Sequence, residues 1–430
     1  MRSAPLWAIA DGDNFYVSCS RLFNPKLIGR PVVCLSSNDG VAISRSAESK
    51  QLGIAMGAPW HQIKHFEKSH GLIAVSSNFA LFADISDRMM NVIAEFGKTI
   101  IYSIDESFLF IPSRGAGGTP TQFCQEIRKR VFQNVGIPIG VGIGETATLA
   151  KAAQQFAKKR PECNRVCDLS VAAQGSSAAV EALMDTIEVG DTWGVGRQHS
   201  ARLKQYGIHT MLDLRRASPS WVRKQFSVVL EKTVLELNGI SCINPGEVPA
   251  NPQQVICSRA FGSPIMTEQE LGEALSEYVS LAAVRLRAKR VKTNMLHIFI
   301  TTSRFRTDEK QYSAGLSISM STPTSDTMTL IGAALAGLRK IYKPGYRYSK
   351  AGVMLLDLQD EGQLQHNLFS PAVDSELMPT IDAINDRWGK GALRVASCGN
   401  ADEQRWRMKQ NRISPNFTTD FNELPVAWAR

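Results

Sequence analysis

The sequence has no run of about 18 apolar residues, so we expect no membrane span. Its 43% hydrophobic and 21% charged residues are ordinary for a globular chain. The eight cysteines form no framework, because the nearest pair, Cys163 and Cys167, has no second Cys or His pair at zinc-ligand spacing. Reduced, mostly buried thiols are expected. The segment from Met1 to Pro5 shows neither a long apolar core nor a signal-cleavage pattern, which favours a cytoplasmic location.

Positive charge is concentrated in one part of the chain. The net charge is +9 over 430 residues. Residues 250–350 contain 14 Lys and Arg against 7 Asp and Glu, a local charge of +7. A segment of this kind suggests an anionic partner, most simply a nucleic acid backbone, although a solvated basic surface is common. At ~150 residues per domain, the length predicts about three domains.

An acidic pair within an apolar stretch is the first candidate site. Asp105 and Glu106 lie in a run from Ile100 to Phe110 that otherwise has the composition of a buried strand. A buried carboxylate needs a cation, or its pKa shifts until it is neutral. A strand end with both carboxylates turned to solvent explains this stretch equally well.

A second acidic stretch favours a metal site over a strand end. The apolar run from Leu6 to Ala10 ends at Asp11, and its strand can lie beside the one carrying Asp105. Strand side chains alternate between faces, so we expect Asp11 and Asp105 to share one face, with Glu106 swung in by a turn or bulge. Three carboxylates about 4 Å apart would repel by roughly 4 kcal/mol per pair at an effective dielectric near 20. Two Mg²⁺ ions would remove that cost and form the clamp used in nucleotidyl transfer.

Three stretches of the chain resemble the Y-family translesion DNA polymerases: Asp11 to Tyr16, Tyr102 to Glu106, and Val141 to Gly144. Their order, their spacing and the C-terminal tail are most similar to the UmuC branch. The resemblance covers essentially the whole chain. It implies template-directed, error-prone DNA synthesis past damaged template bases during the SOS response, by two-metal transfer from a dNTP to a primer 3′-hydroxyl.

The resemblance implies an α+β multidomain fold arranged as a right-hand polymerase. Local patterns agree, because apolar residues recur at helical spacing over 79–96 and 119–133, and alternating strands follow residue 254. The predicted domains are a palm (1–15 and 83–168), fingers (16–82), a helical thumb with a helix-hairpin-helix (169–238), a linker (239–253), a little finger (254–357) and a C-terminal partner- and clamp-binding region (358–430).

The resemblance also implies roles for individual residues around the acids. Asp11, Asp105 and Glu106 would be catalytic and would hold two Mg²⁺ ions, with Mn²⁺ as an alternative and the Gly12 carbonyl as an extra ligand. Tyr16 would be the steric gate against a 2′-hydroxyl, although two aromatics at a helix start are usually core filler. Residues implied to contact the nucleotide are Phe15, Tyr16, Ser44, Lys50 and Lys158. Ala47 stands where many relatives carry tyrosine, which suggests a roomier triphosphate pocket.

Further positions are implied to bind DNA and protein partners. The hairpin glycines Gly194 and Gly196, with Arg197, would hold a DNA phosphate, and Arg259 would contact DNA from the little finger. The peptide containing Gln365, Leu368 and Phe369 resembles a bacterial sliding-clamp motif, with two apolar anchors and a polar rim contact. The implied partners are primer-template DNA, dNTP, the sliding clamp, a processed UmuD-type dimer and a RecA filament.

Two other functions fit parts of the sequence. A nucleotidyl cyclase also uses an Asp and an acidic pair, but it has no need of the thumb hairpin, the basic segment or the clamp peptide. A non-catalytic, clamp-tethered subunit would not require the acids, and this chain keeps Asp11, Asp105 and Glu106.

Overall fold

The computed structural model describes residues 6–111, 118–247, 253–363, 376–400 and 404–424. The chain forms two compact units: unit 1 comprises Met1–Ser36, Gly40–Val248 and Arg412–Arg430, and unit 2 comprises Ser37–Asp39 and Pro249–Asn411. Among the described residues, no helix is both long enough and apolar enough to span a bilayer. All eight cysteines are free thiols and six of them are buried, as expected.

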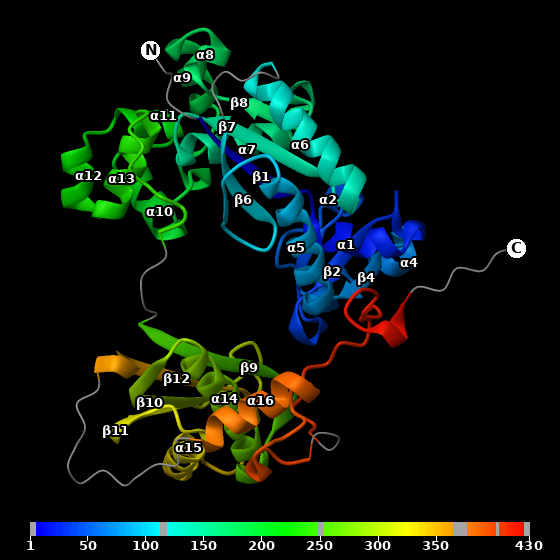
Figure 1. Ribbon diagram of the computed structural model, residues 1–430, viewed down its shortest axis with the longest axis vertical. Helices are drawn as coiled ribbons and strands as arrows, with labels where there is room; N and C mark the ends of the chain where they lie inside the picture. The colour runs from blue at the N-terminus through cyan, green and yellow to red at the C-terminus, as the bar shows by residue number, and fades with distance from the viewer. Residues whose placement is uncertain (1–5, 112–117, 248–252, 364–375, 401–403, 425–430) are drawn as a thin grey trace, which may run out of the picture. The chain divides into compact units, whose positions relative to one another are not determined.

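Unit 1 is built around a five-stranded sheet in the order β5-β6-β1-β7-β8 (Figure 1). The central strand β1 is buried along its whole length and pairs antiparallel with β6 and β7. The strands are β1 (Leu6–Gly12), β5 (Thr99–Ile101), β6 (Glu106–Ile111), β7 (Ile139–Gly144) and β8 (Val166–Asp168). Because strand side chains alternate, Ala8 and Ala10 join the core under helices α5 (Phe79–Ala94) and α6 (Pro120–Val135), whereas Trp7 and Ile9 face helix α7 (Ala147–Lys159).

Helix α7 lies unusually close to strand β7. A Cβ added to Gly142 would lie 2.2 Å from the Ala150 carbonyl oxygen, and one added to Gly144 would lie 2.6 Å from the Ala150 nitrogen. Only glycine permits this approach. The opposite side of α7 belongs to the core of the following helical segment, where the buried Glu236 accepts a hydrogen bond from the Thr148 N–H at 3.0 Å.

The fingers segment of unit 1 contains a three-stranded sheet in the order β3-β2-β4. Strand β2 pairs antiparallel with β3 and parallel with β4. The elements are α1 (Phe15–Phe23), β2 (Val32–Leu35), β3 (Ala42–Arg45), α2 (Ala47–Gln51), α3 (Trp60–Ile63), α4 (Phe66–His70) and β4 (Ile73–Ser76).

The predicted helical thumb segment is helical throughout. Its helices are α8 (Val171–Gln174), α9 (Ser177–Asp185), α10 (Arg197–Gln205), α11 (Met211–Arg216), α12 (Pro219–Gln225) and α13 (Val228–Leu237). The element directly before the hairpin is only a 3₁₀ turn, Val189–Asp191, because the glycine-rich stretch disfavours a longer helix.

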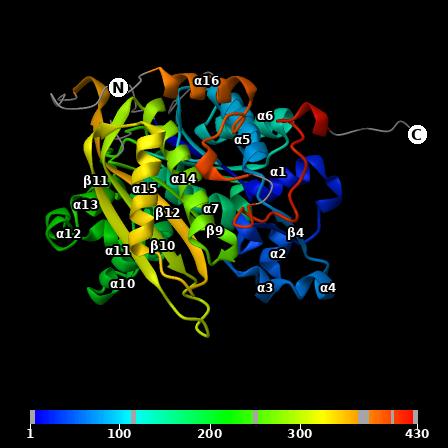
Figure 2. The same cartoon turned by 90° about the horizontal axis from the view of Figure 1, so that it is seen from below.

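Unit 2 is a four-stranded antiparallel sheet in the order β11-β10-β12-β9, covered on one face by two helices (Figure 2). Its elements are β9 (Gln254–Ile265), α14 (Glu268–Ala288), β10 (Val291–Thr302), β11 (Ser313–Thr324), α15 (Thr327–Ile341), β12 (Tyr348–Asp360) and α16 (Leu377–Trp388). Side chains of β11 alternate between exposed and half-buried, so the sheet keeps one open face. The C-terminal region contributes Trp406, which is buried in this core.

The boundaries of palm, fingers, thumb and little finger within these units stay a prediction.

Candidate active site

The carboxylates of Asp11 and Glu106 lie opposite each other on neighbouring strands. In the antiparallel pairing of β1 with β6, Asp11 is the direct partner of Glu106. Both side chains therefore point to the α7 face of the sheet, as Trp7 and Phe108 do. The expectation that Asp11 shares its face with Asp105 is wrong, because the strand begins at Glu106 and Asp105 belongs to the preceding turn.

Asp105 approaches the same strand end from that turn. Its carbonyl oxygen accepts the Gly12 N–H at 2.9 Å, and its carboxylate accepts a hydrogen bond from Ser103 Oγ at 2.7 Å. Burial raises the pKa of Tyr16 on α1, and the negative charge of Asp105 raises it further. The Asp11–Glu106 pair and the backbone of Asp105 thus lie at the same end of the sheet, two residues from the strands and one from the turn.

One face of helix α7 presents polar side chains to these acids. Lys158 Nζ donates to Asp11 Oδ1 at 2.5 Å, and Gln154 Nε2 donates to Asp11 Oδ2. Lys151 Nζ donates to Glu106 Oε1 at 2.7 Å. Positions 151, 154 and 158 are three and four residues apart, so they lie on one side of the helix.

Burial and the neighbouring cations give the two paired carboxylates opposite pKa shifts. Burial raises the pKa of Asp11 to about 7, even though Lys158 opposes the shift. Burial also raises the pKa of Glu106, but the hydrogen bond with Asp11 and the charge of Lys151 outweigh it, so the pKa of Glu106 is lowered. The pair is therefore arranged to share a proton or to accept a cation.

The chemistry of these ligands fits a hard divalent ion. Asp11 is 5% exposed, and an ionised carboxylate at that depth requires compensating positive charge. Lys158 supplies this charge to Asp11, and Lys151 supplies it to Glu106. Among the residues that the structure describes, no three His, Cys, Asp or Glu side chains are already arranged around one metal position. Binding of a divalent ion would therefore require these lysines to release the carboxylates.

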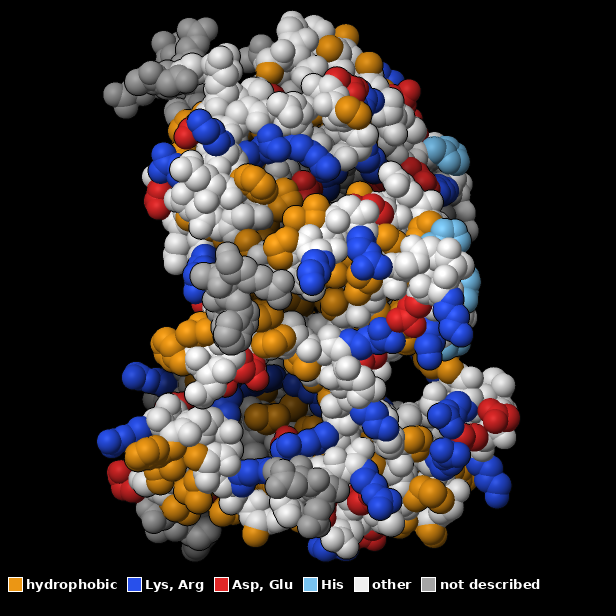
Figure 3. All heavy atoms as spheres, turned by 90° about the vertical axis from the view of Figure 1, so that its right-hand side faces the viewer, with side chains coloured by type: hydrophobic (Ala, Val, Ile, Leu, Met, Phe, Trp, Pro, Cys, Tyr) orange, Lys and Arg blue, Asp and Glu red, His pale blue; other side chains and the backbone are white. Residues whose placement is uncertain are grey.

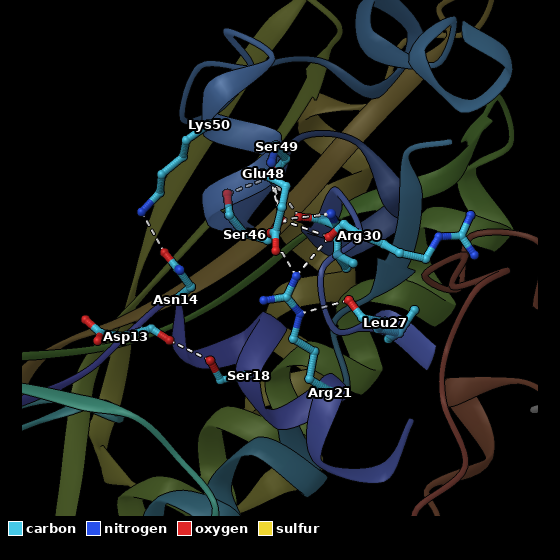
Figure 4. A network of polar contacts seen from close by, with 11 residues as sticks. Asp13, Asn14, Ser18, Arg21, Leu27, Arg30, Ser46, Glu48, Ser49 and Lys50 are labelled. Atoms are coloured by element: carbon cyan, nitrogen blue, oxygen red, sulfur yellow. Dashed lines mark hydrogen bonds and ion pairs between the residues drawn. The ribbon is translucent and has the colours of Figure 1, made fainter. Parts of the chain in front are cut away.

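A second polar cluster joins the start of α1 to α2 at Asn14 (Figure 4). Lys50 of α2 points toward Asn14 and donates to its Oδ1 at 2.6 Å. Ser44 Oγ of β3 donates to the Asn14 carbonyl oxygen at 3.2 Å. Asn14 is the N-cap of α1 and adopts a left-handed conformation with φ of 49°, and its carbonyl oxygen also accepts the Val17 N–H at 2.9 Å. The structure thus brings Ser44 and Lys50 together.

Several cations repel one another around Lys50. Burial lowers the pKa of Lys50, and the charges of Arg45 and Lys158 lower it further. The acid that partly compensates is Asp13, which pairs with Arg165 at 3.3 Å. A cluster with this excess of positive charge is suited to a polyanion such as a triphosphate.

The two aromatic residues at the start of α1 have different surroundings. Phe15 is 3% exposed and packs directly on Gly12, where an added Cβ would lie 2.9 Å from its ring. The partly exposed Tyr16 stacks on Phe82 of α5, with ring centres 4.8 Å apart. Tyr16 can therefore meet a ligand with its ring edge or hydroxyl, whereas a nucleotide contact by Phe15 stays a prediction.

The predicted DNA contacts are spread over both units. In unit 1, Gly194 has φ of 90°, Gly196 precedes α10, and the exposed Arg197 is the first residue of that helix. In unit 2, Arg259 is exposed on β9. Figure 3 shows Lys and Arg side chains scattered over one face of the molecule and not gathered in a single patch. The clamp-motif residues Gln365, Leu368 and Phe369 lie outside the described residues.

Three polar residues of this region were missed by the sequence analysis. Lys151 and Gln154 precede Lys158 at helical spacing, and that periodicity is the signal that could have identified them. Asn14, directly after the acidic stretch, showed no comparable signal, because its role depends on its backbone conformation.

The chain matches three family models along its length. The impB/mucB/samB family matches residues 10–155, and the impB/mucB/samB family C-terminal domain matches residues 252–368. A domain of unknown function, DUF4113, matches residues 375–427.

Individual relatives match over nearly the full length. Protein SamB of Salmonella typhimurium is 41% identical over 427 residues, 98% of this chain and 99% of that protein. Protein UmuC of Salmonella typhimurium strain LT2 is 40% identical, covering 97% of this chain and 99% of that protein. A solved Y-family DNA polymerase chimera, Dbh-Dpo4(243-245)-Dbh, shares the fold, with a TM-score of 0.63 at 17% identity, covering 83% of this chain and 99% of that one.

Proposed function

We propose a residue-level account of catalysis from the premise that this chain belongs to the impB/mucB/samB family of UmuC-like, Y-family translesion DNA polymerases. As a DNA polymerase, it binds DNA and a dNTP. Asp11, Asp105 and Glu106 form its catalytic centre. The observation that supports this assignment best is the pairing of Asp11 with Glu106, with Asp105 bonded to the same strand end through Gly12.

The three carboxylates and the Gly12 carbonyl oxygen would hold two Mg²⁺ ions, or Mn²⁺ in their place. When bound, such ions supply charge stabilisation to the primer hydroxyl, the transferred phosphoryl group and the leaving pyrophosphate. Lys158 and Lys151 neutralise the same carboxylates in the metal-free protein. The charge of the site is thus balanced before and after metal binding.

Ser44, Lys50 and Lys158 bind the triphosphate of the incoming nucleotide. Support comes from the meeting of Ser44 and Lys50 at Asn14 and from the lowered pKa of Lys50, which an added polyanion would reverse. Lys158 moves its charge from Asp11 to the phosphates as the nucleotide arrives. The exposed Ala47 at the start of α2 leaves room beside them.

Tyr16 acts as the steric gate against ribonucleotides. Phe15 holds the start of α1 in place by packing on Gly12. The stack on Phe82 holds the Tyr16 ring in place. A rigid ring discriminates better than a mobile one, because its displacement by a 2′-hydroxyl costs more.

The thumb and the little finger bind the DNA duplex through its backbone. Gly194, Gly196 and Arg197 offer backbone N–H groups and a guanidinium to one phosphate. Arg259 and the open face of the unit 2 sheet supply further contacts. Affinity should fall with salt by about 0.9 in log K per unit of log salt concentration for each phosphate neutralised.

We infer the remaining partners from the family and from the sequence of the C-terminal region (358–430). We propose that Gln365, Leu368 and Phe369 bind the sliding clamp. A processed UmuD-type dimer and a RecA filament are the proposed regulators of its SOS activity, in the cytoplasm.

Primer extension on a damaged template with Mg²⁺ tests the catalytic assignment. Asp105→Ala should lower kcat by at least about 10²-fold, because the ligand contributes several kcal/mol of charge stabilisation. The matched control is Asp87→Ala, an acid exposed on α5. Retention of wild-type extension by Asp105→Ala would remove the carboxylate centre from the mechanism.

A further inference from the structure

A C-terminal strap, defined as Arg412–Phe417, packs on unit 1. The strap runs beside β4, the edge strand of the fingers sheet, where the red segment of Figure 1 lies. The Ser76 N–H donates to the Arg412 carbonyl oxygen at 2.9 Å, and the Arg412 N–H donates to Ser76 Oγ at 3.0 Å. The strap therefore covers an open sheet edge from within the same chain.

The side chain of Arg412 ties the strap to two fingers helices. Its Nη1 forms an ion pair with Glu67 of α4 at 2.8 Å. Its guanidinium carbon lies 5.0 Å from the centre of the Trp60 ring on α3. Two geometrically specific contacts by one side chain are unusual for a loosely attached tail.

Further along, the strap reaches helices α1 and α5. Asn78, which caps α5 and is 2% exposed, donates to the Ser414 carbonyl oxygen at 3.2 Å and to Asn416 Oδ1 at 3.1 Å. Phe417 stacks on Phe23 at the end of α1, with ring centres 4.8 Å apart and 18° between the ring planes. The strap thus connects the fingers sheet to α1 and α5.

The elements joined by the strap are those that carry the nucleotide site. Ser44 lies on β3 of the bridged sheet and Lys50 lies on α2, which packs against that sheet. Tyr16 lies on α1 and stacks on Phe82 of α5. A three-stranded sheet of four-residue strands is small, so its orientation depends on such external contacts.

We propose that the strap is a positioning element for the incoming nucleotide, fixing the fingers residues Ser44 and Lys50 relative to the gate at Tyr16. This gives a role to the last part of the region matched by a domain of unknown function. The inference rests on the proposed function of the same site. The partner- and clamp-binding role of residues 358–430 stays a prediction beside it.

The test is a charge reversal at the Arg412–Glu67 ion pair in the full-length chain. Arg412→Glu and Glu67→Arg should each raise the KM for dNTP by about three- to tenfold, with kcat and primer-template affinity within twofold of wild type. The double variant Arg412→Glu with Glu67→Arg should recover part of the rise in KM, because the swap restores the ion pair but not the contact of a guanidinium with the Trp60 ring. Lys68→Glu, an exposed charge reversal on the same helix, is the matched control and should leave KM unchanged.

Two further measurements keep the proposal falsifiable. The rate of hydrogen exchange at the Ser76 amide should rise in both single variants and should fall back toward the wild-type rate in the double variant. Phe417→Leu, which keeps an apolar side chain and loses the stack, should raise KM by about two- to fivefold.

The two hypotheses fail in distinguishable ways. An unchanged KM in Arg412→Glu and Phe417→Leu, or no restoration in the double variant, overturns the strap proposal while Asp105→Ala still abolishes extension. Loss of binding to an added partner protein with unchanged KM would assign the strap to docking. Activity in Asp105→Ala would instead overturn the catalytic assignment.

Discussion

Replacing Asp11 with Asn should abolish polymerisation and, in the absence of metal, stabilise the protein at high pH. The burial that raises the pKa of Asp11 to about 7 from the ordinary 3.8 disfavours its ionised form in the folded state. Between these two values the folded state binds more protons than the unfolded state, so stability falls as pH rises. At pH 8 the folded wild-type protein bears the full free-energy cost of burying an ionised Asp11. The asparagine side chain has no charge, so the variant does not bear this cost.

The magnitude follows from the size of the shift. Three units at about 1.36 kcal/mol each give a ceiling of roughly 4 kcal/mol. The lowered pKa of Glu106 works in the opposite direction and depends on its contact with Asp11, so part of the gain is lost when that carboxylate is replaced. We expect Asp11→Asn to be about 1–3 kcal/mol more stable than wild type at pH 8, with the difference vanishing near pH 4.

The assay is chemical unfolding in EDTA at several pH values between 4 and 9, followed by the fluorescence of the tryptophans. Asp87→Asn, the same carboxylate-to-amide change on the exposed side of α5, is the control and should show no pH-dependent gain. Adding Mg²⁺ should stabilise wild type and not Asp11→Asn, because only ligand that binds the folded state shifts the equilibrium. The stability gain of Asp11→Asn over wild type should be larger at pH 8 than at pH 5. An equal gain at both pH values would refute the conclusion that burial of the ionised Asp11 destabilises the folded protein.

Other perturbations test neighbouring parts of the structure. Gln154→Ala should lower kcat about tenfold, because the amide orients Asp11, and Gln154→Asn should have an intermediate kcat. Wild-type activity of the Ala variant in single-turnover extension would contradict this role. Tyr16→Ala should admit ribonucleotides, measured as the ratio of kcat/KM for dNTP and rNTP, and an unchanged ratio would disprove the gate. Gly142→Ala should destabilise the fold by at least about 3 kcal/mol, since its Cβ would lie 2.2 Å from the α7 backbone, whereas Gly332→Ala, in open space on α15, should not lower the melting temperature. Arg197→Ala should reduce the slope of log K against log salt by about one if this residue contacts a phosphate.

Much of the fold could be predicted because its signals are local. The helical spacing over 79–96 and over 119–133 depends only on neighbouring residues, and both predicted helices are present. The alternating strands after residue 254 likewise form one sheet.

The site could be predicted only in part, because its geometry depends on strand register. The sequence shows that Asp11, Asp105 and Glu106 lie near strand ends, but the strand start decides which acid faces Asp11. A shift of one residue exchanges the two faces of a strand. The apolar run around Asp105 and Glu106 contains no residue that fixes where the strand begins. The contacts of the last segment could not be predicted either, since Arg412 and Glu67 are brought together by tertiary structure alone.

Helix α7 is shared between two tasks, and this sharing has a mechanical consequence. One side of the helix carries Lys151 and Lys158, which contact the carboxylates of the proposed site. The other side packs in the core of the predicted thumb segment, which would bind the product duplex. The backbone of this helix lies directly against that of β7, where Gly142 and Gly144 leave no space for a side chain. A displacement of the predicted thumb segment relative to the sheet would therefore act directly on the helix that holds Lys151 and Lys158 beside Glu106 and Asp11.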